Sequence, residues 1–217
     1  MKLKRLAIVT SASSWFVPYA KYFVAKLRRK GYAVRFFNRY EEINNSADVV
    51  FILSYFRLIK PAFLKKHTYN LVVHESQLPQ GRGWAPFFWQ ISEGKNKIPV
   101  VLFEATEKLD RGGIFIRENI SLEGYELNEE IRKKQAEAVM ALCLKFLKAF
   151  PHIKTKKQVG RASYYRRRIA EDSKLNINKS IKEQFNLLRI VHNEDFPAFF
   201  IYKKQKYILN GIVRGIE

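Results

Sequence analysis

The chain has 217 residues, which is enough for one sizeable core with a small appendage and too few for two full domains. Its composition, 47% hydrophobic and 28% charged, excludes a disordered chain, and a single cysteine excludes a disulfide framework. The apolar runs are too short to span a membrane, and the first residues have the pattern of a strand rather than a cleavable leader. We therefore expect a cytoplasmic protein with no membrane partner.

The formal charge of +20 is the strongest compositional signal. A charge this far from neutrality attracts anionic partners, among them nucleic acid, membrane surfaces and phosphorylated substrates. The sequence has no long basic run or basic tail, so solvated surface residues explain most of these charges equally well. The four histidines show no ligand spacing with acids or cysteine, and we expect no metal.

Short apolar strands alternate with helical segments over the first two thirds of the chain. The expected strands are residues 6–9, 32–37, 48–53, 71–74, 99–103 and 114–116, and the expected helices are 18–31, a short one from 61, 84–93 and 129–150. This alternation predicts an α/β fold: a Rossmann-like, mostly parallel sheet with helices on both faces. In such folds ligands lie outside the carboxyl ends of the strands.

Two of these helices have recognisable faces. The first has its apolar residues at Tyr22, Phe23 and Leu27. The long helix, which Asn128 is positioned to cap, is interrupted by Gln135, so we expect its first turns to be less buried than the rest.

The composition changes after Pro151. We expect residues 1–150 to form the main domain and residues 151–217 a small C-terminal extension packed on it, ending in a β-hairpin over 198–213. Aromatic residues at 199–202 are compatible with a homodimer interface, and core packing explains them equally well.

His74 is the first candidate for chemistry. It ends a buried strand and precedes a loop in which Gly81 and Gly83 allow a ligand to approach the backbone. Histidine is the side chain best suited to proton transfer near neutral pH. A strand-end histidine bonded to a backbone carbonyl is an equally good reading of the spacing alone.

Asp110 is the second candidate. It lies in the loop 104–113, which follows the next long strand, and it comes shortly before two glycines. If the two strands are neighbours, Asp110 can hold the ring of His74 in one tautomer, as an acid behind a base does. An aspartate in a polar turn is the plain alternative.

The residues around these two candidates resemble a known family. The pattern comprises His74, Ser76, Leu78, Pro79, Gly83, Ala85, Pro86, Leu109, Asp110, Gly112 and Ile114. It is similar to the core motif of the N10-formyltetrahydrofolate-dependent transferases, over roughly residues 1–120. That family includes methionyl-tRNA, glycinamide ribonucleotide and sugar-nucleotide formyltransferases.

The resemblance implies roles for particular residues. It implies that the segment 1–150 is the catalytic domain, that His74 is the acid/base group and that Asp110 orients it. It also implies N10-formyltetrahydrofolate as co-substrate, with contacts from two loops: Phe56, Arg57 and Leu58 in the first, and Thr106, Glu107, Lys108 and Leu109 in the second.

One position departs from the family pattern. The family has asparagine two residues before the histidine, as a donor to the oxyanion of the tetrahedral intermediate, and this chain has Val72 there. Asn70 is on the same strand face but about 7 Å further back, at a rise of about 3.3 Å per residue. The oxyanion donor is therefore left unassigned, and a folate- or nucleotide-binding relic without turnover is one alternative function.

The acceptor follows from further resemblances. The loop after the first strand has no glycine, unlike a phosphate loop for glycinamide ribonucleotide, and Trp15 gives it an aromatic character suited to stacking on a sugar or base. The tail resembles sugar N-formyltransferases, which implies that Tyr164, Tyr165, Arg166 and Arg168 bind a nucleotide. Solvated basic residues at a strand edge would have the same sequence.

We therefore expect a small-molecule nucleotide sugar as partner and no nucleic acid. The segment 74–84 is most similar to enzymes that formylate the 4-amine of a UDP-4-amino-4,6-dideoxy sugar, a precursor of pseudaminic acid. A methionyl-tRNA formyltransferase-like enzyme remains the alternative. Such an enzyme suits the charge of this chain, but the methionyl-tRNA enzymes that the sequence resembles are longer and have a separate C-terminal barrel.

Overall fold

The computed structural model describes residues 3–215 and has a six-stranded sheet at its centre. The strand order is β2-β1-β3-β4-β6-β7. These strands are β1 (Arg5–Val9), β2 (Ala33–Phe37), β3 (Val49–Ile52), β4 (Tyr69–His74), β6 (Lys97–Glu104) and β7 (Ile114–Ser121). The first four are parallel, and β6 runs antiparallel to both β4 and β7. The predicted α/β, mostly parallel fold is confirmed.

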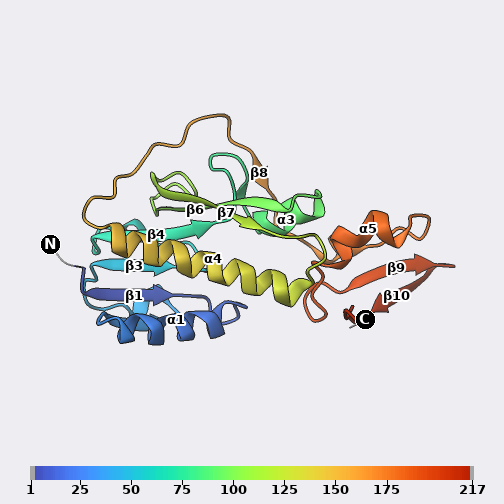
Figure 1. The fold of residues 1–217 in the computed structure, drawn as a ribbon, viewed down its shortest axis with the longest axis horizontal. Helices are drawn as coiled ribbons and strands as arrows, with labels where there is room; N and C mark the ends of the chain where they lie inside the picture. Colours follow the sequence, from blue (N-terminus) through green and yellow to red (C-terminus); the bar gives the residue numbers. More distant parts are fainter. Residues whose placement is uncertain (1–2, 216–217) are drawn as a thin grey trace.

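The long helices cover one face of this sheet (Figure 1). Helices α1 (Val17–Arg29), α3 (Pro86–Ser92) and α4 (Asn128–Ala149) pack on one apolar cluster with β1, β3, β4 and β6. The opposite face is covered by the short helix α2 (Pro61–Leu64), the 3-10 turn η1 (Tyr40–Glu42) and a loop that carries Leu78. Helices therefore lie on both faces, with most of the helical cover on one.

Two expectations about helix faces are wrong. Tyr22 is 53% exposed, because the buried stripe of α1 is Ala20, Phe23, Val24 and Leu27. Gln135 in α4 is 5% exposed, and its amide nitrogen donates to the carboxylate of Glu75 at 2.7 Å. A polar side chain with a hydrogen-bond partner can lie inside the apolar stripe. Asn128 begins α4 rather than capping it, and its side chain donates to the carbonyl of Ile190.

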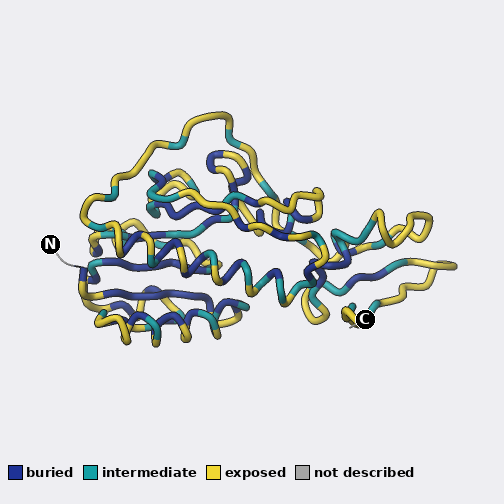
Figure 2. The backbone as a smooth tube through the Cα atoms, viewed as in Figure 1, coloured by how far each residue is buried: buried dark blue, intermediate teal, exposed yellow. Residues whose placement is uncertain are grey.

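After α4 the chain returns across the molecule to the carboxyl ends of the parallel strands (Figure 1). The extended segment 151–163 bonds to the start of β7 and leads to the short strand β8 (Tyr164–Tyr165), which pairs with β5 (Arg82–Gly83). The 3-10 turn η2 (Ala170–Ser173), helix α5 (Ile181–Leu188) and the predicted hairpin of β9 (Ala198–Tyr202) and β10 (Gln205–Leu209) complete an appendage. Its outer strand is largely exposed (Figure 2).

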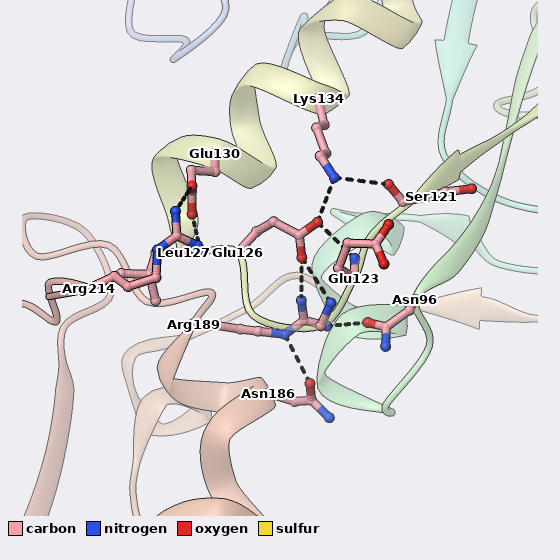
Figure 3. Close-up of polar contacts among 11 residues, drawn as sticks. Asn96, Ser121, Glu123, Glu126, Leu127, Glu130, Lys134, Asn186, Arg189 and Arg214 are labelled. Atoms are coloured by element: carbon pink, nitrogen blue, oxygen red, sulfur yellow. Dashed lines mark hydrogen bonds and ion pairs between the residues drawn. The ribbon is translucent and has the colours of Figure 1, made fainter. Parts of the chain in front are cut away.

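A buried ion pair fastens the appendage to the main domain (Figure 3). Arg189, which follows α5, is fully buried and lies 3.5 Å from the carboxylate of Glu126, which is 2% exposed. The guanidinium also donates to the side chains of Asn96 and Asn186. Lys134 of α4 donates to the same carboxylate at 2.6 Å. The junction is therefore a paired and hydrogen-bonded charge cluster, which is the form in which proteins accept buried charge.

Candidate active site

His74 lies at the carboxyl end of β4 and is 7% exposed. Its Nε2 is 2.8 Å from the carbonyl oxygen of Gly81, and its ring is edge-on to Phe103. Because a carbonyl oxygen can only accept, the neutral ring carries its proton on Nε2. The other nitrogen, Nδ1, is then the basic one. The structure thus fixes one tautomer of His74 and leaves a base for proton transfer.

The loop after His74 folds back over the face of the sheet. Leu78 is 1% exposed and packs with Val101 and Phe103, and its carbonyl accepts a hydrogen bond from Arg117 at 3.0 Å. Gly81 has a φ of +71°, where a side chain would also clash with Ser76. Glycine at this position lets the loop turn tightly enough to return its carbonyl to His74.

Asp110 is held against the far end of the same loop. Its carboxylate accepts the N–H of Gly83 at 3.0 Å, and its backbone is left-handed with a φ of +53°. Its main-chain carbonyl accepts from Arg82 and from Gln158, both at 2.9 Å. Gly112 makes the return possible, since a Cβ there would lie 1.7 Å from the carbonyl oxygen of Glu104. Hydrogen bonds to both the side chain and the main chain of Asp110 therefore fix the position of its carboxylate.

His74 and Asp110 each form a hydrogen bond with the loop that follows β4, but they are not bonded to each other. Over residues 3–215, no hydrogen bond or ion pair joins the two side chains. Because β6 is antiparallel to β4, the end of β6 at Glu104 lies opposite Leu71, away from His74. The link runs through the backbone, from His74 to Gly81 and from Gly83 to Asp110. Direct orientation of His74 by Asp110 stays a prediction.

The second predicted folate loop lines an open hollow of about 250 Å³. Its lining includes Pro61, Leu64, Lys65, His67, Thr68, Asn70, Glu104, Ala105, Thr106 and Glu107. Buried polar atoms face no partner here among the described residues, namely Oδ1 of Asn70 and Nε2 of His67. Ligand sites usually measure about 300–1,000 Å³. The hollow would therefore take one end of a larger polar ligand.

The other predicted folate residues do not line this hollow. Phe56, Leu58 and Leu109 are exposed by 47%, 71% and 66%. The guanidinium of Arg57 is paired with Glu41 at 3.1 Å, and the carbonyl of Lys108 accepts from Thr106. Their contact with folate stays a prediction.

Asn70 belongs to the hollow rather than to His74. Its side-chain nitrogen donates to the carbonyl of Leu64 at 2.8 Å, and its main-chain carbonyl accepts the N–H of Ala105. This arrangement directs the amide away from the end of β4, so it gives no support to Asn70 as the missing oxyanion donor. Val72 packs in the apolar cluster with Leu78.

The tail segment reaches the His74 loop through the β5–β8 pairing. Tyr165 stacks on Trp89, with centroids 6.3 Å apart, and its hydroxyl donates to Glu93. Burial and this hydrogen bond raise the pKa of Tyr165 to about 12. Arg166 is paired with Asp172. Tyr164 is 63% exposed. The structure brings all three to the site, and their binding of a nucleotide stays a prediction.

Arg132, in the second turn of α4, is a residue that the sequence reasoning missed. Its guanidinium carbon lies 4.3 Å from the ring centroid of Trp15 and 4.2 Å from that of Phe88. Burial lowers the pKa of Arg132 to about 9, with Glu75 opposing this and Arg168 adding to it. An arginine on a helix is usually solvated, so no sequence signal distinguished this one. Gln158 and Arg82, which hold Asp110, were missed because their contacts join segments far apart in the sequence.

Two features are absent from the part of the chain that the structure describes. Within residues 3–215, no group of three or more potential metal ligands occurs. None of the described helices is both long and apolar enough to cross a membrane.

Comparison with known proteins gives a consistent family. The sequence pattern of the family described as formyl transferase matches residues 33–147, more than half of the chain. A methionyl-tRNA formyltransferase of Thermosipho melanesiensis is 27% identical over 176 residues, covering 80% of this chain and 56% of that protein. The chain spans about half the length of the methionyl-tRNA formyltransferases it matches.

Solved structures share the fold. A sugar N-formyltransferase from Shewanella superposes with a TM-score of 0.70 at 16% identity, covering 98% of this chain and 99% of that one. HypX from Aquifex aeolicus, solved with tetrahydrofolic acid, gives a TM-score of 0.79 at 16% identity, covering 95% of this chain and 37% of that one. At these identities the similarity establishes the fold alone.

Proposed function

Because the chain belongs to the formyl transferase family, we propose that it transfers a formyl group from N10-formyltetrahydrofolate to the amino group of a nucleotide-linked amino sugar. The observation that carries the proposal is the position of His74. It has a fixed tautomer at the end of β4, and a backbone loop joins it to a fixed Asp110. The hollow lined by Thr106 and Glu107 has several polar residues in its wall, which suits one end of the folate.

The proposed reaction is an acyl transfer between two nitrogens. The acceptor amine attacks the formyl carbon, a C–N bond forms, and the carbonyl electron pair moves to oxygen. The pair then returns as the bond to N10 breaks. Nδ1 of His74 takes the proton from the attacking nitrogen and gives it to N10, so the histidine ends the cycle as it began. Asp110 would stabilise the positive charge that develops nearby.

The acceptor is proposed from the tail. The β5–β8 pairing brings Tyr164 to the His74 loop, Arg168 follows three residues after β8, and aromatic and guanidinium groups bind bases and phosphates. A sugar N-formyltransferase is among the structural relatives. We propose the 4-amine of a UDP-4-amino-4,6-dideoxy sugar, the pseudaminic acid precursor, as the specific acceptor.

Methionyl-tRNA is the second candidate acceptor, favoured by the Thermosipho relative and the charge of +20. A competition experiment separates the two. The protein is incubated with N10-formyltetrahydrofolate, a panel of amino-sugar nucleotides and methionyl-tRNA, and products are read by mass spectrometry. We expect one formyl group on a sugar nucleotide and none on the tRNA. Formylation of tRNA alone would make methionyl-tRNA the acceptor. Formylation of neither acceptor would indicate a folate- or nucleotide-binding protein without turnover.

A further inference from the structure

The region on the helix side of β4 has two arginines that the reaction at His74 does not use. Glu75, the residue after His74, faces α4, where it accepts from Gln135, and Gln135 in turn accepts from Arg132 at 3.2 Å. Arg168, from the segment after β8, is half-buried and is close enough for its charge to depress the pKa of Arg132. Two like charges are therefore held near each other beside the catalytic strand.

Neither of these two charges has a direct ion-pair partner in the part of the chain that the structure describes. Across residues 3–215, no carboxylate lies within ion-pair distance of Arg132 or Arg168, whereas the fully buried Arg189 has Glu126. Each of the two makes a single side-chain hydrogen bond, Arg132 to Gln135 and Arg168 to Ser173. Partly buried cations normally have a counter-charge. The carboxylates of Glu75 and Asp195 act on Arg132, and that of Asp172 on Arg168, from beyond ion-pair distance, so the guanidinium N–H donors stay available to a ligand anion.

Aromatic rings hold both guanidiniums. Arg132 lies over Trp15 and Phe88, and Arg168 lies over Phe196 at 5.2 Å. Stacking occupies the flat face of a guanidinium and leaves the N–H donors at its edge for other partners. Donors fixed in this way fork onto phosphate oxygens with little loss of side-chain freedom. The rings thus prepare the arginines to bind an anion.

The place in the fold also suits a ligand. Trp15 is in the loop after β1, where the strand order of the sheet changes direction between β1 and β3. Open α/β sheets bind ligands in the crevice at this switch point. Arg168 lies just before η2 and contacts Ser173 and Phe196 of the appendage, so a ligand here would lie between the two parts of the chain.

We propose that Arg132 and Arg168 together bind the diphosphate of the acceptor. This inference rests on the proposed function, and it assigns to Arg132 a binding role that the sequence did not suggest. Trp15 also holds Arg132 in position, and its stacking on a sugar or base stays a prediction. The nucleotide would extend toward Tyr164, and the amino sugar toward His74.

The test is calorimetric titration with UDP and with inorganic pyrophosphate. We expect the wild type to bind both, and Arg132→Met and Arg168→Met each to weaken binding by about 10- to 100-fold, since a hydrogen bond to a charged group is lost. Arg132→Lys keeps the charge without the fork and should bind with intermediate affinity. Arg35→Met is the matched control, because Arg35 also lies over an aromatic ring, Phe37, on the far side of the sheet. Thermal unfolding checks that each variant folds.

The outcomes separate this inference from the proposed function. Unchanged UDP and pyrophosphate affinity in folded Arg132 and Arg168 variants overturns the inference, and formyl transfer to the sugar amine would then still stand. A wild type that binds neither anion yet formylates the sugar also overturns only the inference. A wild type that neither binds UDP nor formylates any sugar nucleotide overturns both.

Discussion

The two sides of the end of β4 are built differently. On the loop side, His74 and Asp110 are each fixed by hydrogen bonds to backbone groups of one loop. On the helix side, aromatic rings hold the guanidiniums of Arg132 and Arg168, and most of their N–H donors have no protein partner among the described residues. A group that moves a proton needs one fixed position, whereas groups that bind an anion need free donors. The contrast suggests that one side performs the reaction and the other side holds the substrate.

The largest effect is expected on the loop side. His74→Ala should lower formyl transfer by about 100- to 10,000-fold, because the proton of the attacking amine has no acceptor. Binding of the folate, which we place at the hollow, should be retained. Measuring transfer by mass spectrometry and folate binding by fluorescence tests both parts. Unchanged transfer would contradict the role of His74.

The junction between domain and appendage gives the next effect, on stability. Arg189→Met removes one of the two cations that contact the buried carboxylate of Glu126 and leaves Lys134, so the loss should approach but not exceed that of a broken buried pair, about 3–5 kcal/mol. Chemical denaturation of this variant measures the loss. Arg5→Met, which removes an exposed pair with Asp48, is the control and should cost below about 1 kcal/mol. Equal losses in the two variants would show that the junction is not a fastening point.

Glu126 also makes a pH prediction. Burial alone would raise its pKa, but hydrogen bonds from Lys134 and from the backbone outweigh burial and lower the pKa to about 2. A carboxylate with a lowered folded-state pKa stabilises the protein above its unfolded pKa of 4.5. This stabilisation should fall as the pH drops from about 4.5 to about 2, and Glu126→Gln should flatten that part of the curve. An identical acid profile in the variant would refute the assignment.

A smaller effect is expected from Gly112→Ala, which tests whether the loop side is held by its backbone. The new Cβ meets the carbonyl oxygen of Glu104, and overpacking of this kind costs about 1–3 kcal/mol. Because Asp110 is displaced as well, formyl transfer should fall more than stability alone explains. Gly215→Ala, in open space, is the control. Equal activity in the two variants would mean that the fixed position of Asp110 is unimportant.

The smallest effect on stability is expected from Arg57→Met, which removes an exposed pair with Glu41 worth below about 1 kcal/mol. If Arg57 contacts the folate, the KM for N10-formyltetrahydrofolate should rise while stability barely changes. An unchanged KM would remove Arg57 from the proposed folate site.

Much of the fold could be predicted because hydrophobic periodicity reports burial. The alternation of strands and helices led to the α/β sheet, and the turn residues near Lys203 led to the final hairpin. Strand direction has no periodic signal, so the reversal of β6 was not expected. It separates the end of β6 from the end of β4 and explains why Asp110 reaches Gly83 rather than His74.

The site was less accessible from the sequence than the fold. His74 and Asp110 were found through a family motif, and the structure shows how Gly81 and Gly83 connect them. Arg132 was not found, because its importance depends on rings from two other segments of the chain. Contacts of this kind arise only when distant segments pack together.

The most direct test of the two-sided account compares His74→Gln and Arg132→Met in steady-state kinetics with the sugar-nucleotide acceptor. We expect opposite changes: a lowered kcat with little change in acceptor KM for the histidine variant, and a raised acceptor KM with little change in kcat for the arginine variant. If both variants change the same parameter to a similar extent, the division between a reacting side and a binding side is wrong.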